Sequence, residues 1–168
     1  MEQLNHYNIA FQERKFSITV ICDEVYFQQN IGSVFRICDA FGVEKIIFTG
    51  EHFLLSERKV NKTSRNTHKT VPFEIIKDKD VIINSLLKQK YQIIALEITD
   101  SSTSIDKIEL TNQPIALVIG SEIYGVSKKF LEAAAFTSHI IMFGKNSSMN
   151  VANSLSISLY EITKQLSL

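Results

Sequence analysis

The chain has 168 residues, of which 45% are hydrophobic, and its 18 basic and 18 acidic side chains leave a net charge of 0. This composition excludes a disordered chain, because it supplies enough apolar surface for a core. It also excludes a uniformly basic nucleic-acid binder, so any contact with RNA must come from a local patch. Cys22 and Cys38 lie in apolar segments without zinc-type spacing, which predicts buried free thiols and no metal site. No run approaches a membrane span and no apolar signal core follows Met1, so we expect a cytoplasmic protein without membrane contact.

Short apolar runs alternate with helical patterns along the chain. A buried strand is expected at 16–22, and the next helix carries an apolar stripe that begins at Ile31 and stops at Gly42. Further strands are expected at 45–49, 71–76, 91–98, 115–119 and 138–142, and further helices at 78–89 (with Val81, Ile82, Leu86 and Leu87 inward), 127–135 and 148–166. This alternation predicts an α/β fold with a mainly parallel sheet flanked by helices. No linker divides the chain, so we expect one domain over 1–168, with 1–15 as a lead-in.

The first segment that could carry chemistry is 30–42. With the apolar stripe facing the core, a rotation of about 100° per residue puts Arg36 on the opposite side of the helix. This pattern fits a solvated Arg36 paired with Asp39, and it also fits a functional Arg36. Asn30 is expected to cap the helix.

The second segment, 116–127, ends a strand at Gly120 and continues through a short loop into a helix. Ligands bind at the carboxyl ends of strands in α/β sheets, so this loop is either a plain turn or a ligand loop. The spacing from Gly120 to Gly125 is neither the dinucleotide fingerprint nor a Walker loop. By itself, Glu122 in this loop is typical of a cap or a surface charge.

The third segment, 51–70, gathers basic side chains in a stretch whose helical periodicity is poor after residue 60. The basic side chains are Arg58, Lys59, Lys62, Arg65 and Lys69, and Glu51 and Glu57 are the acidic side chains of the same stretch. Charge alone fits a solvated basic loop as well as a surface that contacts phosphates. His52 and His68 lack metal-ligand partners at a useful spacing, so we expect no metal here.

A fourth segment, 143–161, combines a polar start with an apolar helix. The helix carries an apolar stripe formed by Val151, Leu155, Leu159, Ile162 and Leu166. Small and amide side chains crowd its start, namely Gly144, Asn146, Ser147, Ser148 and Asn150. These side chains either cap the helix or hydrogen-bond to a ligand, and the pattern leaves both possibilities open.

Three of these segments resemble, in order, the three motifs of the SpoU (TrmH-like) RNA 2′-O-ribose methyltransferases, within the SPOUT superfamily. The matching residues are Asn30, Arg36, Phe41 and Gly42 in the first motif; Gly120, Glu122, Gly125, Val126 and Ser127 in the second; and Met142, Gly144, Ser148, Met149, Asn150 and Val151 in the third. The resemblance covers nearly the whole chain from Phe16. Ile141 stands where the family usually has proline, so the resemblance does not define the path of this loop.

The resemblance implies a C-terminal trefoil knot that holds S-adenosylmethionine. Small residues at the start of the last helix would then let the backbone thread through a tight loop. Carried over from the family, the residues expected to bind the cofactor are Leu96, Gly120, Ile140, Ser148 and Met149.

The resemblance also implies that a ribose 2′-oxygen attacks the methyl group of the cofactor. The family assigns activation of that hydroxyl to Arg36, but a guanidinium stays protonated and is better suited to hold a phosphate or stabilise the developing alkoxide. Asn30 is expected to orient Arg36 or the RNA phosphate, and Glu122 to fix the motif loops. Ser148 and Asn150 are expected to shape the pocket.

The resemblance implies two partners, because family members act on RNA and are dimers whose site is completed across the interface. The residues then expected to contact RNA are Arg58, Lys59, Lys62 and Arg65. Transfer RNA and ribosomal RNA are both substrates within the family. The lack of an extra N-terminal RNA-binding domain and of basic extensions favours transfer RNA. The alternatives are a catalytically silent relative that binds RNA or the cofactor, and a small-molecule enzyme that would bind a nucleotide phosphate instead.

Overall fold

The computed structural model describes residues 12–167, which build a seven-stranded sheet whose paired strands all run parallel. The strands are β1 (Phe16–Asp23), β2 (Val43–Thr49), β3 (Phe73–Ile75), β4 (Gln92–Leu96), β5 (Thr103–Ser104), β6 (Ile115–Gly120) and β7 (Phe136–His139). Their order in the sheet is β3-β2-β1-β6-β4-β7-β5. The predicted α/β fold with a mainly parallel sheet is therefore confirmed. The trefoil knot and the single domain over 1–168 stay predictions, and most of the lead-in at 1–15 lies outside the described residues.

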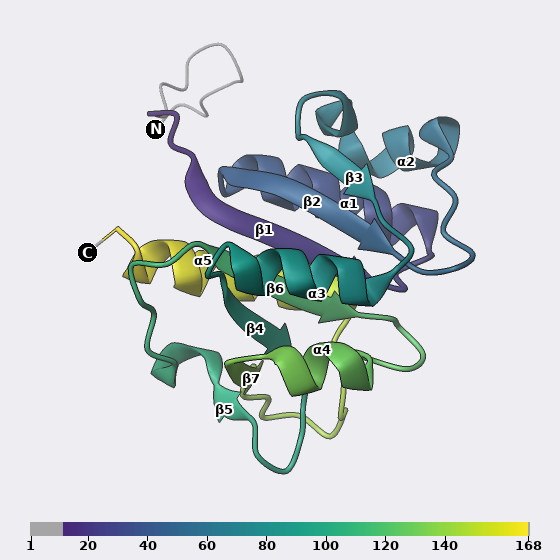
Figure 1. Ribbon diagram of the computed structural model, residues 1–168. Helices are drawn as coiled ribbons and strands as arrows, with labels where there is room; N and C mark the ends of the chain where they lie inside the picture. The colour runs from purple at the N-terminus through teal and green to yellow at the C-terminus, as the bar shows by residue number, and fades with distance from the viewer. Residues whose placement is uncertain (1–11, 168) are drawn as a thin grey trace, which may run out of the picture.

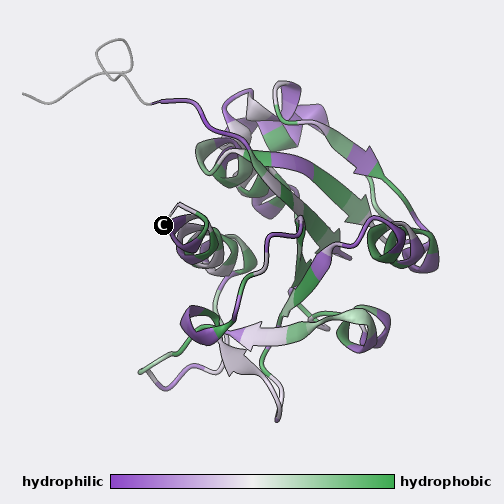
Figure 2. Cartoon of the chain, turned by 60° about the vertical axis from the view of Figure 1, so that its left-hand side comes forward, coloured by the Kyte–Doolittle hydropathy of each residue, from purple (hydrophilic) through white to green (hydrophobic). Residues whose placement is uncertain are grey.

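Helices cover both faces of this sheet (Figure 1). One face carries α1 (Gln28–Ala40), α2 (Glu57–Ser64) and α5 (Val151–Gln165), and the other carries α3 (Lys79–Lys88) and α4 (Lys128–Ala133). Short 3₁₀ turns occur at Thr67–Lys69 and Ile105–Lys107. Each face has its own apolar core, and hydrophobic residues make up most of the central strands between them (Figure 2). Strands buried on both faces explain why β1 and β6 consist of nearly continuous apolar runs.

Helix α2 was not predicted, and its presence follows from close packing against α1. A Cβ atom on Gly32 of α1 would lie 2.4 Å from the carbonyl oxygen of Val60, so only glycine allows the two helices to approach this closely. Val60 and Ser64 are buried in this contact, while the rest of the helix is polar. Its short apolar stripe is too weak a signal for a sequence pattern, and the solvated loop considered for 51–70 contains a helix at 57–64 instead.

Two other predictions were wrong in detail. The strand expected at 138–142 lies earlier, as β7, because residues 136–138 pair with β4, residues 138–139 pair with β5, and the chain leaves the sheet after His139. Val81 and Leu87 of α3 are exposed, whereas Ile82 and Leu86 are buried as expected. A helix on the outer layer buries one narrow stripe, so these two flanking apolar residues remain in solvent.

Candidate functional site

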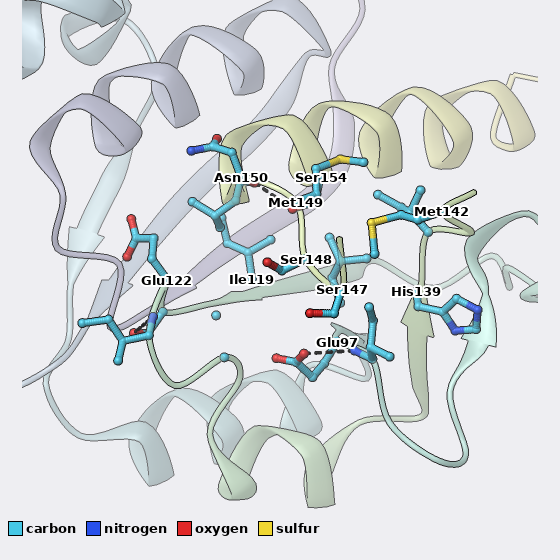
Figure 3. A pocket seen from close by; sticks show the side chains of 18 residues that line it. Glu97, Ile119, Glu122, His139, Met142, Ser147, Ser148, Met149, Asn150 and Ser154 are labelled. Carbon is cyan, nitrogen blue, oxygen red and sulfur yellow. Dashed lines mark hydrogen bonds between the residues drawn. The ribbon is translucent and has the colours of Figure 1, made fainter. Parts of the chain in front are cut away.

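A cavity of about 570 Å³ lies where the carboxyl ends of β4 and β6 meet the segment before α5 (Figure 3). Its apolar wall includes Leu96, Ile119, Ile140, Met149 and Val151. Its polar wall includes Glu97, Ser121, Glu122, His139, Ser147, Ser148, Asn150 and Ser154. A cavity of this size, with an apolar wall and convergent polar groups, suits a small organic ligand.

All five residues predicted to bind the cofactor line this cavity. Leu96 ends β4 and Gly120 ends β6, so both lie at the carboxyl edge of the sheet, where α/β proteins bind ligands. Ile140 follows β7, and Ser148 and Met149 precede α5. The structure thus brings together residues from four separate segments, and their binding role stays a prediction.

Three predicted catalytic residues form a chain of hydrogen bonds at the edge of the cavity. Asn30 donates from Nδ2 to Glu122 Oε1 at 2.6 Å, and Asn150 donates from Nδ2 to Asn30 Oδ1 at 3.1 Å. Each residue comes from a different motif, and the partners are 92 and 120 residues apart in the sequence. The chain therefore fixes the relative positions of α1, the loop after β6 and the start of α5.

Of the polar residues at the start of the last helix, Asn150 is a helix cap. Its Oδ1 accepts from the backbone N–H groups of Ala152, at 2.9 Å, and Asn153, at 3.4 Å, so it caps α5. Its Nδ2 is free to bond Asn30 at the same time. The Asn150 side chain therefore caps the N-terminus of α5 and also connects two motifs.

Asn30 does not cap α1, and that prediction was wrong. The helix begins at Gln28, two residues earlier, and its N-cap position is Phe27. Asn30 therefore lies in the first helical turn, where its side chain reaches Glu122 instead of the helix backbone. Gly144 was expected to be small so that the backbone could pass through a tight loop. A Cβ atom there would meet nothing within 4 Å, so crowding does not explain this glycine.

Arg36 is exposed on α1 and does not line the cavity. It lies six residues after Asn30, which is about 9 Å along a helix. Within residues 12–167 it takes part in no ion pair or side-chain hydrogen bond, and Asp39 instead accepts a long bond from Thr70 Oγ1 at 3.5 Å. The guanidinium is thus available to a ligand that approaches α1 from solvent.

The predicted RNA-contacting residues lie on α2 and at its end, away from the cavity. Arg58, Lys59, Lys62 and Arg65 are all exposed. Arg65 is the C-cap of α2 with a left-handed φ of 49°. Because α2 packs on α1, this basic surface and Arg36 belong to one pair of helices on the same side of the sheet.

Sequence reasoning missed Asp23, which lies at the end of β1 and supports the second motif. The buried carboxylate accepts from the backbone N–H of Ser127 at 2.7 Å, and it pairs with Lys79 Nζ at 2.8 Å. Burial lowers the pKa of Lys79, but hydrogen bonds to the carboxylates of Asp23 and Glu24 outweigh it and raise the pKa above its usual value. An acidic residue directly after a buried strand was the available signal for this contact.

Sequence reasoning also missed Glu97, which follows β4 and lines the cavity. No group of three or more potential metal-ligating side chains gathers within residues 12–167. In the same part of the chain, no helix combines the length and the apolar character that a membrane span requires. The walls of the cavity combine apolar side chains, hydroxyls, an amide, an imidazole and two carboxylates.

The profile of the SpoU rRNA methylase family matches residues 17–160. The chain belongs to this family. A relative from Aquifex aeolicus, named tRNA (guanosine(18)-2′-O)-methyltransferase, is 29% identical over 168 residues, which is 98% of this chain and 77% of the relative. The segments that match the family motifs are those that the Glu122–Asn30–Asn150 chain connects.

Solved structures of SpoU-type proteins share this fold. The crystal structure of the TrmH/SpoU tRNA modifying enzyme of A. aeolicus superposes with a TM-score of 0.81 at 27% identity, over 92% of this chain and 78% of the other. An rRNA methyltransferase from Sinorhizobium meliloti, solved with AdoMet bound, gives a TM-score of 0.82 at 22% identity, over 93% of this chain and 59% of the other. The second likeness concerns the fold alone.

Proposed function

We propose that this protein is an S-adenosylmethionine-dependent RNA 2′-O-ribose methyltransferase. The observation that carries the proposal is the hydrogen-bonded chain Glu122–Asn30–Asn150, which connects all three family motifs beside a ligand-sized cavity. Membership of the SpoU family and the names of the relatives give the same reaction class. The test is transfer of tritium from labelled S-adenosylmethionine to RNA, followed by location of the methylated ribose.

The cavity fits S-adenosylmethionine in size and in the chemistry of its walls. About 570 Å³ lies within the usual range for sites of this kind. Leu96, Ile140 and Met149 offer apolar surface for a flat base. Gly120 lets the end of β6 approach the backbone of the following loop, since a Cβ there would lie 2.1 Å from the carbonyl carbon of Gly125. When bound, the cofactor supplies a methyl group on a sulfonium that is a ready leaving group.

The residues of this chain align the RNA for that transfer. Asn30, held between Glu122 and Asn150, presents a fixed amide at the edge of the cavity. Arg36, exposed on the same helix, contacts the RNA phosphate or the developing 2′-alkoxide through its planar donors. Holding the two reactants in line accounts for most of the rate that such a site provides. Ser148 and Asn150 shape the pocket.

We propose transfer RNA as the substrate, in line with the named activity of the A. aeolicus relative. The exposed basic side chains of α2 supply the local positive surface that a chain of net charge 0 requires to hold a polyanion. Mapping the ribose methylations that are lost when the gene is deleted tests the substrate directly. Loss confined to ribosomal RNA would contradict transfer RNA and leave the reaction class intact.

We further propose that the protein acts as a homodimer in the cytoplasm. Ile157 and Tyr160 on α5, together with Ile141 and Phe143 before it, are exposed apolar side chains close to the cavity segment. Burial of such a patch against a second copy stabilises a dimer and would bring partner residues towards Arg36. Sedimentation velocity at micromolar concentration should give a dimer, and a monomer alone would contradict a shared site.

A further inference from the structure

Glu97 lines the cavity but belongs to none of the three motifs. Its carboxylate is fixed by backbone donors: Oε1 accepts from the N–H of Ile98 at 3.0 Å, and Oε2 accepts from the N–H of Val126 at 2.8 Å. No ion pair within residues 12–167 includes Glu97. The carboxylate is thus held in one orientation at the wall of the cavity, and no cationic side chain of the described residues pairs with it.

The fold makes room for this carboxylate at Gly125. That residue has a left-handed φ of +68°, and a Cβ atom on it would lie 2.2 Å from Glu97 Oε2. Only glycine therefore lets the backbone at 125–126 come close enough for the bond from Val126. The glycine and the two N–H donors are separate features that place the same carboxylate at the same point.

The bound carboxylate keeps hydrogen-bonding capacity for a ligand. A carboxylate has roughly four acceptor sites, and the two backbone bonds use one site on each oxygen. The remaining sites are on two adjacent oxygens, which match the two adjacent hydroxyl donors of a vicinal diol. Nucleotide-binding α/β folds use the same chemistry where an acidic side chain accepts hydrogen bonds from ribose hydroxyls.

We propose that Glu97 binds the 2′- and 3′-hydroxyls of the cofactor ribose, an inference that rests on the proposed function. Figure 3 shows Glu97 on the side of the cavity away from Asn150 and Glu122. Leu96, the preceding residue, lies on the apolar wall that would contact the base. The nucleoside would then lie at Glu97, which leaves the methyl-bearing end of the cofactor towards the Glu122–Asn30–Asn150 chain.

The test is calorimetric binding of nucleosides in the absence of RNA. The probes are 5′-methylthioadenosine, its 2′-deoxy and 3′-deoxy forms, and S-adenosylhomocysteine. Wild-type protein should lose about 10- to 100-fold in affinity for each missing hydroxyl, because a hydrogen bond to a charged acceptor is lost. Glu97→Gln should bind the parent nucleoside more weakly and should discriminate the deoxy forms by only about threefold or less.

A control separates ligand contact from loop positioning. Ser121→Ala loosens the same loop, since Ser121 Oγ accepts from the N–H groups of Ile123 and Tyr124. This variant should weaken all the nucleosides by one common factor and keep the discrimination against the deoxy forms. If Glu97→Gln behaves in the same way, Glu97 only positions the loop and the inference is overturned.

Three other outcomes are equally decisive. If Glu97→Gln weakens S-adenosylhomocysteine but leaves 5′-methylthioadenosine unchanged, the carboxylate meets the amino group of the ligand and the assignment to the diol is wrong. If the wild type binds none of the four probes, the proposed cofactor is wrong and the inference about Glu97 fails with it. If the wild type binds S-adenosylhomocysteine, but Glu97→Gln discriminates against the deoxy forms as strongly as the wild type does, the inference about Glu97 is wrong and the proposed cofactor stands.

Discussion

Asn150 Nδ2 lies 3.1 Å from Asn30 Oδ1, and this hydrogen bond joins residues 120 positions apart in the chain. The same Asn150 side chain caps α5 through Oδ1. A single amide thus combines helix stability with the geometry of the site, and substitutions can separate the two effects.

Asn150→Asp should keep the cap and lose the connection. Aspartate is as good a capping residue as asparagine, so the free energy of unfolding should change by less than about 0.5 kcal/mol. The donor to Asn30 becomes an acceptor, so methyl transfer should fall sharply. Asn150→Ala should lose activity and also about 1 kcal/mol of stability. Urea unfolding and a tritium-transfer assay measure both, and a fully active Asn150→Asp variant would exclude a role for this bond.

Arg36→Ala should lower methyl transfer at least about 100-fold, by the loss of a charged group that acts at the reacting oxygen or phosphate. Affinity for S-adenosylmethionine should be nearly unchanged, because Arg36 does not line the cavity. Arg36→Lys should not restore activity, because lysine lacks the planar fork. Lys88→Ala, an exposed cation on α3 at the opposite face, is the control and should be fully active. Near-normal turnover by Arg36→Ala would disprove the assignment.

Replacement of the four basic side chains on α2 by glutamine should flatten the salt dependence of RNA binding. Each lost phosphate contact should reduce the slope by roughly one unit, because fewer counterions are released. Glutamine preserves helix propensity, so the fold of α2 should persist. The matched control replaces four exposed lysines elsewhere, namely Lys88, Lys107, Lys128 and Lys129. If RNA affinity depends on salt with the same slope in the wild type and in this variant, these four side chains do not contact RNA phosphates.

Gly120→Ala should destabilise the protein by about 1–3 kcal/mol, typical of overpacking. The added Cβ would lie 2.1 Å from the carbonyl carbon of Gly125 and 2.2 Å from the backbone nitrogen of Val126, neither of which can move aside cheaply. Binding of S-adenosylmethionine should weaken as well. Gly144→Ala is the matched control, because its Cβ would meet nothing, and it should stay within about 0.5 kcal/mol of the wild type. Equal effects of the two substitutions would contradict this reading of the loop.

Cys22 and Cys38 are free and buried, as predicted. Burial raises the pKa of both thiols, and nearby carboxylates raise the pKa further. Native thiols should therefore react with thiol reagents at pH 8 at least about 100-fold more slowly than unfolded ones. The stability from this shift is fully present below the ordinary thiol pKa and declines as pH rises above it, because only the unfolded state then loses protons. A Cys22→Ala/Cys38→Ala variant should show a smaller decline between pH 8 and pH 9.5.

The sequence predicted the inner strands well because β1, β2, β4 and β6 each contain a short run of consecutive apolar residues. It could not predict α2 or β5, which depend on contacts far away in the chain. The close approach at Gly32 supports α2, and two residues paired with β7 make up β5.

For the site, the motif resemblance nominated Asn30, Glu122 and Asn150 individually. Pattern alone assigned Asn30 to a cap, because it placed the start of α1 three residues too late. The bonds between these three side chains depend on the packing of α1 against α5, which no local pattern contains. Glu97 was missed for the same reason, since its partner Val126 is 29 residues away.

Several of the residues that line the cavity lie between 139 and 154, and these are the last of the lining residues to leave the ribosome. A growing chain therefore has no complete pocket until the start of α5 has emerged and docked. The ligand cannot assist the folding of the earlier strands, but it can hold the finished molecule together by mass action. The first binding of cofactor to a growing chain therefore marks the moment when the start of α5 has docked, and it can be used to time this last step of folding.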